Sequence, residues 1–330
     1  MLLIVIMWLT FIMTYMLLNI TPGNGSTVIS SYDYGVRCYK NPSLTRVYNT
    51  STVFLFLEAH VDRCYNSDDN GNMIALRSYD DGKTWSPPLS IASSCKYTHS
   101  PQSFLFNSHT YIIYVCDNYG VAWRKVRNTT VSREHYYKNI SKGNTIKIHS
   151  TGIVSPSGKI SMPITTGEQF MTLYSEDLVI WKTGTRIPMM SSGTFEYIDN
   201  TTVLLQTQTI FKFNAIVNSY DEGKTWSDIQ SVYPLRRNKP TMIKHNGIIY
   251  SISTEGFISG YGLTVYIYNI YEQFWLQYYT IDSGASYDAS AVVKYDGSIL
   301  VCYEKGWRSS IHCTIVVPYT ESLVPIDVQI

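Results

Sequence analysis

The sequence predicts an all-β fold built from a repeated unit, and three observations support this prediction. One eight-residue phrase occurs twice, at residues 78–85 and 219–226. Short runs rich in β-branched and aromatic residues recur between turn residues along the chain. No stretch combines a sustained 3.6-residue apolar period with capping residues at both ends. The phrase and its spacing then indicate the size of the unit.

The repeated phrase has the composition of a hairpin turn. Its aspartate can accept backbone N–H bonds, its glycine can adopt a positive φ, and its tryptophan can bury a large ring beside the turn. We call each copy of this phrase an Asp-box and assign it a structural role. The residues concerned are Ser78, Asp80, Gly82 and Trp85 in the first copy and Ser219, Asp221, Gly223 and Trp226 in the second.

Two weaker copies of the phrase give the repeat length. One runs from Ser175 to Trp181 and the other from Tyr268 to Trp275. The starting positions 78, 175, 219 and 268 fit a unit of about 44 to 49 residues, which is the length of a propeller blade. The roughly 305 residues after the N-terminal segment make about six such units. The sequence thus predicts one six-bladed β-propeller domain over residues 26–330.

The expected strands follow this pattern in order along the chain. Several begin directly after a turn dipeptide such as Asn246-Gly247 or Asp296-Gly297. The clearest apolar runs are residues 52–57, 111–115, 202–205, 247–252 and 298–303.

The composition excludes several classes of partner. Charged residues make up 15% of the chain and aromatic residues 14%, with 28 tyrosines, which is typical of strands with amphipathic faces rather than of disorder. Lys plus Arg number 26 and Asp plus Glu 25, so no net field attracts nucleic acid or an anionic membrane. We expect no nucleic-acid partner.

Residues 1–25 read as a signal peptide. They contain an uncharged apolar run followed by the small polar stretch from Thr21 to Ser26, although the segment lacks a basic start. A signal anchor at the membrane is the alternative. No second apolar run is long enough to span a membrane, so we expect a secreted protein that does not contact the membrane once the leader is removed.

Cysteines and sequons agree with secretion. An even count of six cysteines in a chain with a leader suggests disulfides. Cys302 and Cys313 flank an expected hairpin and are predicted to pair. The sequence neighbours Cys38 with Cys64 and Cys95 with Cys116 are the further pairings. N-glycosylation is expected at the downstream sequons Asn49, Asn128, Asn139 and Asn200.

An ordered set of short motifs resembles the exo-α-sialidase (neuraminidase) family over nearly the whole mature chain. Asp-boxes alone are shared by unrelated propellers, but the ordered set is more specific. It comprises the runs 39–44, 57–60 and 67–71, the two Asp-boxes, Ser157-Gly158-Lys159 before Met162-Pro163, and the runs 285–288 and 302–306.

The resemblance implies a six-bladed sialidase-like propeller with its site on the central axis. The substrate of such enzymes carries a carboxylate at the anomeric carbon, and three arginines clamp it bidentately. Because a carboxylate nucleophile would be repelled there, the family uses a tyrosine activated by a glutamate, with a separate aspartate as acid/base.

Two catalytic roles find matching residues. Tyr287 matches the nucleophile, and Asp288 and Glu304 fit its context. Asp68 or Asp69 matches the acid/base aspartate, and the motif leaves the choice between them open. The alternative to a catalytic role is that Tyr287 is an ordinary tyrosine of a strand. For Asp68 and Asp69 the alternative is that they belong to an exposed Asp-Asp-Asn-Gly turn.

The arginine clamp has no matching arginines. Lys40 stands where the arginine of the family's first motif is expected, and Gln208 stands at the next clamp position. The last clamp position falls near Gly260, and His60 stands where a further arginine commonly follows Glu-Ala. A lysine keeps a charge but loses the planar guanidinium. The resemblance implies that the substrate-binding positions are Lys40, Glu58, His60, Gln208 and Glu304.

The activating glutamate of the family aligns near Ser191, and Glu196 would take its place only if the register slips. Seven histidines show no metal-ligand spacing, and no phosphate-cradling glycine loop is present. We expect no metal and no cofactor.

Two hypotheses follow. In the first, the chain is a non-catalytic descendant of a sialidase that binds a partner, either a sialylated glycan or an extracellular protein. In the second, it is an active exo-α-sialidase that hydrolyses terminal sialic acids. The missing clamp favours the first hypothesis, since each lost charge-assisted contact is worth about 1.5–3 kcal/mol.

Overall fold

The fold was analysed in a computed structural model and consists almost entirely of β-strands. Asp68, Asp69, Asn128, Asn139 and the whole leader up to residue 24 lie outside the residues that the structure describes. The described residues are 25–62, 64, 71–91, 95–117, 120–127, 131–137, 146–150, 152–167, 169–187, 190–209, 214–231, 240–255, 260–271, 274–307 and 309–319.

Among the described residues, four sheets are antiparallel meanders in which each strand pairs with the next along the chain. The third of them also contains a short strand, β11 (Ile153–Val154), that pairs beside β10 on β12. The strands are β2 (Cys38–Arg46), β3 (Val53–His60), β4 (Gly71–Ser78) and β5 (Leu89–Ser90); β6 (Thr98–Phe106), β7 (His109–Cys116), β8 (Gly120–Val126) and β9 (His135–Tyr137); β10 (Ile146–Ile148), β12 (Ile160–Thr166), β13 (Gln169–Ser175) and β14 (Trp181–Thr183); and β15 (Met190–Tyr197), β16 (Val203–Thr209), β17 (Asn214–Ser219) and β18 (Gln230–Ser231).

The fifth sheet has seven strands in the order β1-β24-β23-β22-β21-β20-β19. Its long strand β22 pairs with β21 up to Ala285 and with β23 from Ser286 onward. The first part of β22 therefore ends one meander, and the second part begins the next. The first strand of the described chain, β1, pairs with the last, β24. The bounds are β1 (Ser26–Ile29), β19 (Thr241–His245), β20 (Ile248–Glu255), β21 (Tyr261–Asn269), β22 (Phe274–Val293), β23 (Ile299–Lys305) and β24 (Ser310–Val316), with one short 3-10 helix, η1 (Asp33–Gly35), after β1.

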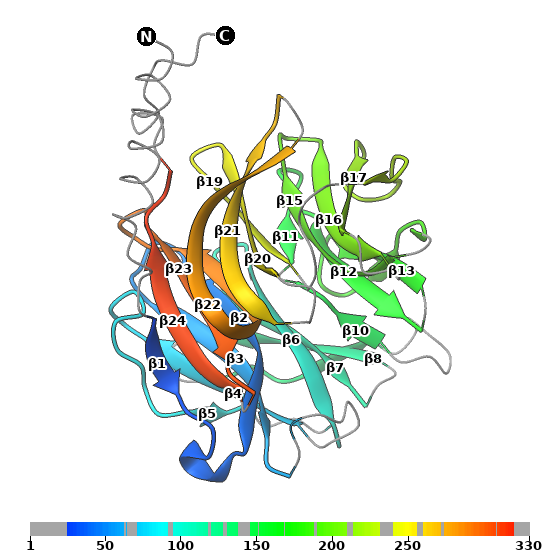
Figure 1. Ribbon diagram of the computed structural model, residues 1–330. Helices are drawn as coiled ribbons and strands as arrows, with labels where there is room; N and C mark the ends of the chain where they lie inside the picture. The colour runs from blue at the N-terminus through cyan, green and yellow to red at the C-terminus, as the bar shows by residue number, and fades with distance from the viewer. Residues whose placement is uncertain are drawn as a thin grey trace, which may run out of the picture.

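Neighbouring sheets contact one another in chain order, as Figure 1 shows by the succession of colours from blue to red. Contacts join β2 with β6, β6 with β10, β12 with β15, β15 with β19, β19 with β22, and β22 with β2. The hydrophobic clusters lie between these sheets: one joins side chains of β3 and β4 to β7 and β8, and another joins β6 to β8 with β12 and β13.

The two copies of the repeated phrase form turns with matching hydrogen bonds. Asp80 accepts hydrogen bonds from the backbone N–H and the hydroxyl of Thr84, at 2.9 and 2.7 Å. Asp221 accepts the equivalent bonds from Thr225 at 2.8 and 2.6 Å. The glycines have φ of 86° and 83°, and the weaker copy at Ser175 also directs Asp177 onto backbone N–H groups.

All three predicted disulfides are present. They join Cys38 to Cys64, Cys95 to Cys116, and Cys302 to Cys313, whose Cα atoms are 4.1 Å apart on paired positions of β23 and β24. Disulfides are typical of oxidising compartments. Within the described part of the chain, no helix is long and apolar enough to cross a membrane.

Candidate functional site

Among the strands that carry a bulge are β2, β6 and β22, which belong to three different sheets. In β2 the register shifts between Lys40 and Ser43, in β6 between His99 and Gln102, and in β22 between Ser286 and Ala289. Bulges re-aim side chains and often occur beside functional sites. The strand β2 contacts both β6 and β22, so the three bulges bring chemistry-bearing residues from distant parts of the sequence together.

Serine hydroxyls fix the alignment of these strands. Ser43 Oγ accepts a hydrogen bond from the Ser103 N–H at 2.8 Å, which joins β2 to β6. Ser290 Oγ accepts one from the Leu44 N–H at 2.9 Å, which joins β22 to β2. These side chains are buried, and buried hydrogen bonds of this kind hold the strands in one register.

Glu58, on β3, connects the bulges of β2 and β6. Its Oε1 accepts hydrogen bonds from the Asn41 side-chain amide, at 2.7 Å, and from the Ser100 backbone N–H. Its Oε2 lies 3.0 Å from His60 Nε2. Both bulge residues have positive φ, 50° at Asn41 and 54° at Ser100. The Glu58 carboxylate therefore bonds within the protein and holds two strained backbone segments in place.

The charge of Glu58 is stabilised by these partners. Burial alone would raise the pKa of Glu58, but the hydrogen bond from His60, the charges of His60 and His99, and the N–H of Ser100 together lower it. Glu58 is 3% exposed. It is thus an ionised, buried and internally satisfied carboxylate.

Glu304, at the end of β23, is a second buried carboxyl, and its pKa is raised, whereas that of Glu58 is lowered. Its Oε1 accepts a hydrogen bond from the Asn41 backbone N–H at 2.7 Å. Burial and then the charge of Asp288 raise the pKa of Glu304 to about 8, Glu58 adds to the rise, and the Asn41 N–H and the charge of Lys40 oppose it. We call Glu58, Asp288 and Glu304 the carboxylate cluster.

Tyr287 lies in the bulge of β22, next to Asp288. Its ring meets the Trp307 ring edge to face, with centroids 6.3 Å apart. The backbone of Gly260 covers the Tyr287 ring, and a Cβ at that glycine would come within 2.5 Å of Tyr287 Cε1. Gly260 also has φ of 96° and accepts a hydrogen bond from the Ser286 N–H at 2.6 Å. No larger residue fits at position 260 unless Tyr287 moves.

The structure brings Tyr287, Glu304, Lys40 and Glu58 to this end of the molecule together with His60. Gln208, on β16, pairs with Ser192, and its carbonyl oxygen accepts a hydrogen bond from the Ser191 hydroxyl at 3.0 Å. The acid/base candidates Asp68 and Asp69 lie outside the described residues, so the structure does not position them.

Glu196 lies away from the Ser191 end of β15. Four residues separate it from Ser192, which is about 13 Å along an extended strand. Its Oε2 accepts a hydrogen bond from the Lys244 N–H at 3.1 Å. Burial raises the pKa of Glu196 to about 6, and its bonds to backbone N–H groups and the charge of Lys244 oppose this. The register of β15 against β16 shifts between Met190 and Ser192, next to Ser191.

Arginines near the N-terminal motifs make other contacts. The Arg37 guanidinium donates to the Asp62 carbonyl at 2.8 Å. Arg77 stacks over the Tyr79 ring at 4.2 Å. Arg63 and Arg308 lie outside the described residues. Within the described part of the chain, the cation that acts on the carboxyl of Glu304 is Lys40.

Three residues that contribute to the site carried no role in the prediction from the sequence. They are Trp307, Ser100, and Asn41, which donates to the carboxylates of both Glu58 and Glu304. One local signal could have indicated the last two. Lys40-Asn41-Pro42 and His99-Ser100-Pro101 both place a proline directly after the residue with positive φ. Trp307 has no comparable signal, because it follows β23 in an exposed turn.

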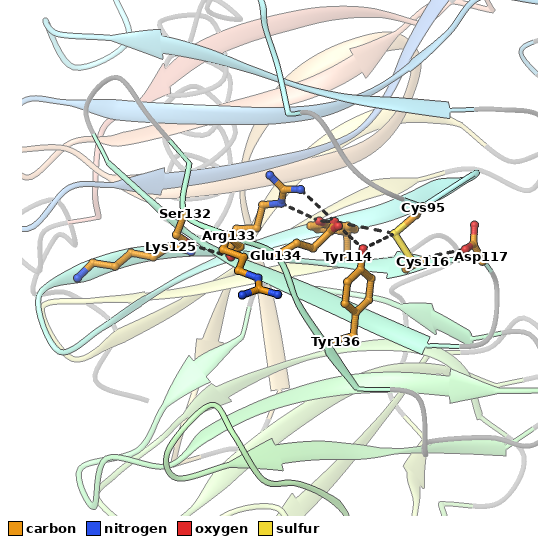
Figure 2. A network of polar contacts seen from close by, with 10 residues as sticks. Cys95, Tyr114, Cys116, Asp117, Lys125, Ser132, Arg133, Glu134 and Tyr136 are labelled. Atoms are coloured by element: carbon orange, nitrogen blue, oxygen red, sulfur yellow. Dashed lines mark hydrogen bonds and ion pairs between the residues drawn. A yellow bond between two sulfur atoms is a disulfide. The ribbon is translucent and has the colours of Figure 1, made fainter.

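A second polar network lies in the sheet of β6 to β9 (Figure 2). The Glu134 carboxylate accepts hydrogen bonds from the hydroxyls of Tyr114 and Tyr136 and lies 3.4 Å from the Arg124 guanidinium. Cys95 of a disulfide lies beside it. Burial, with the Glu134 bond, raises the pKa of Tyr114. This network is satisfied internally and joins β9 to β7 and β8, so it stabilises the sheet.

Comparison with known proteins relates the fold to sialidases. No family model and no curated protein matches the sequence. Among solved structures, NanB sialidase from Streptococcus pneumoniae matches with a TM-score of 0.72 and 14% identity over 90% of this chain and 70% of that chain. A leech intramolecular trans-sialidase matches with a TM-score of 0.73 and 12% identity over 89% and 70%.

Trypanosoma rangeli sialidase matches with a TM-score of 0.68 and 14% identity, over 91% of this chain and 58% of that chain. At these identities the likeness establishes the fold. The chain therefore has a sialidase-like β fold, which confirms the resemblance found in its sequence motifs.

Proposed function

We propose that this chain is a secreted, sialidase-like protein that has lost most or all catalytic activity and acts by binding a partner through the site described above. A glycan is the partner that the site favours, because the fold is that of glycan-processing proteins and the site is polar. An extracellular protein is the other class of partner. On this proposal, residues 1–25 are removed as a signal peptide and residues 26–330 form one six-bladed β-propeller.

Three features support the propeller arrangement. The meanders contact one another in chain order, and β22 contacts β2. The strand β22 serves two successive meanders. The pairing of β1 with β24 joins the two ends of the described chain, which is a way to avoid exposed sheet edges.

The packing of Gly260 against Tyr287 is the observation that carries the proposed loss of activity. The resemblance places the last arginine of the clamp near this position, and a side chain at Gly260 itself would collide with the Tyr287 ring. Lys40 supplies a single point charge, and Gln208 supplies none. A carboxylate substrate would therefore lose the bidentate contacts that orient it.

The phenol of Tyr287 also needs a base, because its ordinary pKa is near 10. Ser191 cannot act as one, and Glu196 is bonded to the backbone of β19. Two ionised or ionisable groups, Asp288 and Glu304, lie close to Tyr287. Their proximity is what favours the second candidate function, an active exo-α-sialidase that hydrolyses terminal sialic acids with Tyr287 as nucleophile and Asp68 or Asp69 as acid/base.

Turnover of a fluorogenic sialoside distinguishes the two functions. We expect a rate at least about a thousandfold below that of NanB sialidase assayed in parallel, since positioning and general-base catalysis contribute about 10² to 10⁴ each. Tyr287→Phe should then leave the residual rate unchanged. Robust hydrolysis that Tyr287→Phe abolishes would establish the enzyme and refute the binding function.

A further inference from the structure

A hollow of about 290 Å³ lies on the first sheet, beside residues of β3, β4 and β5. Among its lining residues, Phe54 of β3 and Ala75 of β4 are buried, each 3% exposed. The segment 86–89, which leads into β5, supplies further lining residues. The volume is at the lower end of the range of ligand pockets, about 300–1,000 Å³. The hollow is therefore large enough for one small molecule.

This hollow is separate from the carboxylate cluster. Glu58 pairs with Met73 toward one end of β3 and β4, and Phe54 pairs with Arg77 toward the other end. Four residues separate Phe54 from Glu58 on β3, which is about 13 Å along an extended strand. An inference about the hollow therefore goes beyond the proposed function.

The lining of the hollow is apolar except at Arg77 and Ser86. Residues 87–89 are Pro-Pro-Leu, and Leu89 is 48% exposed. The Ser86 hydroxyl accepts a hydrogen bond from the Arg77 backbone N–H at 3.0 Å and donates one to the Pro87 carbonyl at 2.9 Å. Arg77 is the one charged residue of the lining. A matching ligand thus has an apolar body and a single negative charge.

The guanidinium of Arg77 is held by an aromatic ring. Its central carbon lies 4.2 Å from the centroid of the Tyr79 ring. Stacking covers a face of the guanidinium, whereas its N–H groups lie in the plane and can still donate. Among the described residues, Arg77 Nε has no hydrogen-bond partner, and the side-chain ion pairs join other residues. This positive charge is therefore not neutralised by an acidic side chain of the described chain.

A carboxylate matches this cation in shape and in charge. A guanidinium binds a carboxylate through two parallel N–H···O bonds. A phosphate group carries about −1.5 to −2 charges at pH 7, which one guanidinium does not balance. The charge of the lining therefore favours a monocarboxylate.

We propose that this hollow binds a small free monocarboxylic acid with an aromatic or branched aliphatic body. Its carboxylate bonds to Arg77, and its body packs against Phe54 and Leu89. A free acid is favoured over the C-terminus of a peptide, because peptides that add to a sheet edge gain affinity from main-chain hydrogen bonds. The edge strand β5 has two residues and offers few such bonds.

Saturation-transfer NMR titrations of the secreted full chain test the ligand class. The probes are 3-phenylpropionate, 3-phenylpropionamide, propionate, and an N-acetylated tetrapeptide that ends in phenylalanine with a free carboxylate. The amide is the matched control, since it has the same body without the charge. We expect 3-phenylpropionate to bind at least about tenfold more tightly than the amide or propionate. The tetrapeptide should bind no more tightly than 3-phenylpropionate.

Three variants locate the binding. Arg77→Gln should weaken binding of 3-phenylpropionate at least about tenfold and leave binding of the amide unchanged. Lys83→Gln, at an exposed position of the turn that follows Arg77, removes the same charge and should change binding less than about twofold. Leu89→Ser, at an exposed position, should weaken binding of the acid and the amide alike. A general loss of folding cannot produce these different patterns.

Each contrary result overturns a stated part of the inference. Equal binding of the acid and the amide to the parent chain, or no binding of the acid, refutes the site without the use of any variant. Equal weakening by Arg77→Gln and Lys83→Gln would show a general effect of charge and refute the role of Arg77. A tetrapeptide that binds at least about tenfold more tightly than the free acid would refute the free acid as the ligand.

Discussion

Replacing Glu304 by glutamine should change how the stability of the protein depends on pH. Burial and the charge of Asp288 raise the pKa of Glu304 from 4.5 to about 8. In the unfolded chain this carboxyl ionises near its ordinary value, so between about pH 4.5 and 8 the folded state binds more protons than the unfolded state. The free energy of unfolding therefore falls as the pH rises through this window.

The size of the effect follows from the two pKa values. One pKa unit corresponds to about 1.36 kcal/mol, so the difference between the folded and unfolded pKa of Glu304 corresponds to about 5 kcal/mol. This value is an upper limit, because Glu304 and Asp288 titrate as a coupled pair. Glutamine stays neutral and keeps a carbonyl oxygen to accept the Asn41 N–H. We expect Glu304→Gln to match the parent near pH 5 and to exceed its stability by several kcal/mol at pH 8.5.

The free energies of unfolding of Glu304→Gln and the parent are measured by urea unfolding, followed by tryptophan fluorescence at pH 5, 7 and 8.5 with the disulfides kept oxidised. Glu58→Gln is the matched control, because the pKa of Glu58 is lowered on folding. Its carboxylate stabilises the fold above about pH 4.5 and loses this as the pH falls, so Glu58→Gln should be less stable than the parent at pH 7. A constant difference between Glu304→Gln and the parent at all three pH values would show that Glu304 is ionised throughout.

The remaining predictions concern local packing and modification. Gly260→Ala should lower the free energy of unfolding by about 2 kcal/mol or more, measured by urea unfolding, because its Cβ meets Tyr287 and its φ is positive; Gly158→Ala, with positive φ and open space around it, should cost less. Asn49 and Asn200 lie exposed in turns, and we expect the secreted protein to lose electrophoretic mass on treatment with an N-glycosidase. An unchanged mass would contradict N-glycosylation.

The sequence predicts those features that depend on residues close together in the chain. In the repeated turns, Asp80 and Asp221 bond to residues at most four positions away, so their geometry is contained in the phrase itself. The pairing of Cys302 with Cys313 likewise follows from one hairpin. These local interactions, with the strand periodicity, are sufficient to predict the fold class.

The arrangement of the site depends on contacts between distant residues. Ser100 meets Glu58 from 42 positions away, and Asn41 meets Glu304 from 263 positions away. The order of the motifs placed Tyr287 and Glu304 in one site by resemblance. It contained no information on which carboxylate oxygens would accept hydrogen bonds from the protein itself. In the structure, Glu58 bonds to Asn41, Ser100 and His60 because the bulges of β2 and β6 both lie against it.

The contact between Gly260 and Tyr287 also bears on how the site can change. A glycine with φ of 96° lies under the ring and accepts a hydrogen bond from Ser286, at the start of the bulge that contains Tyr287. An arginine at position 260 would need the ring, the bulge and the loop backbone to move together. Recovery of a carboxylate clamp is therefore limited by Gly260.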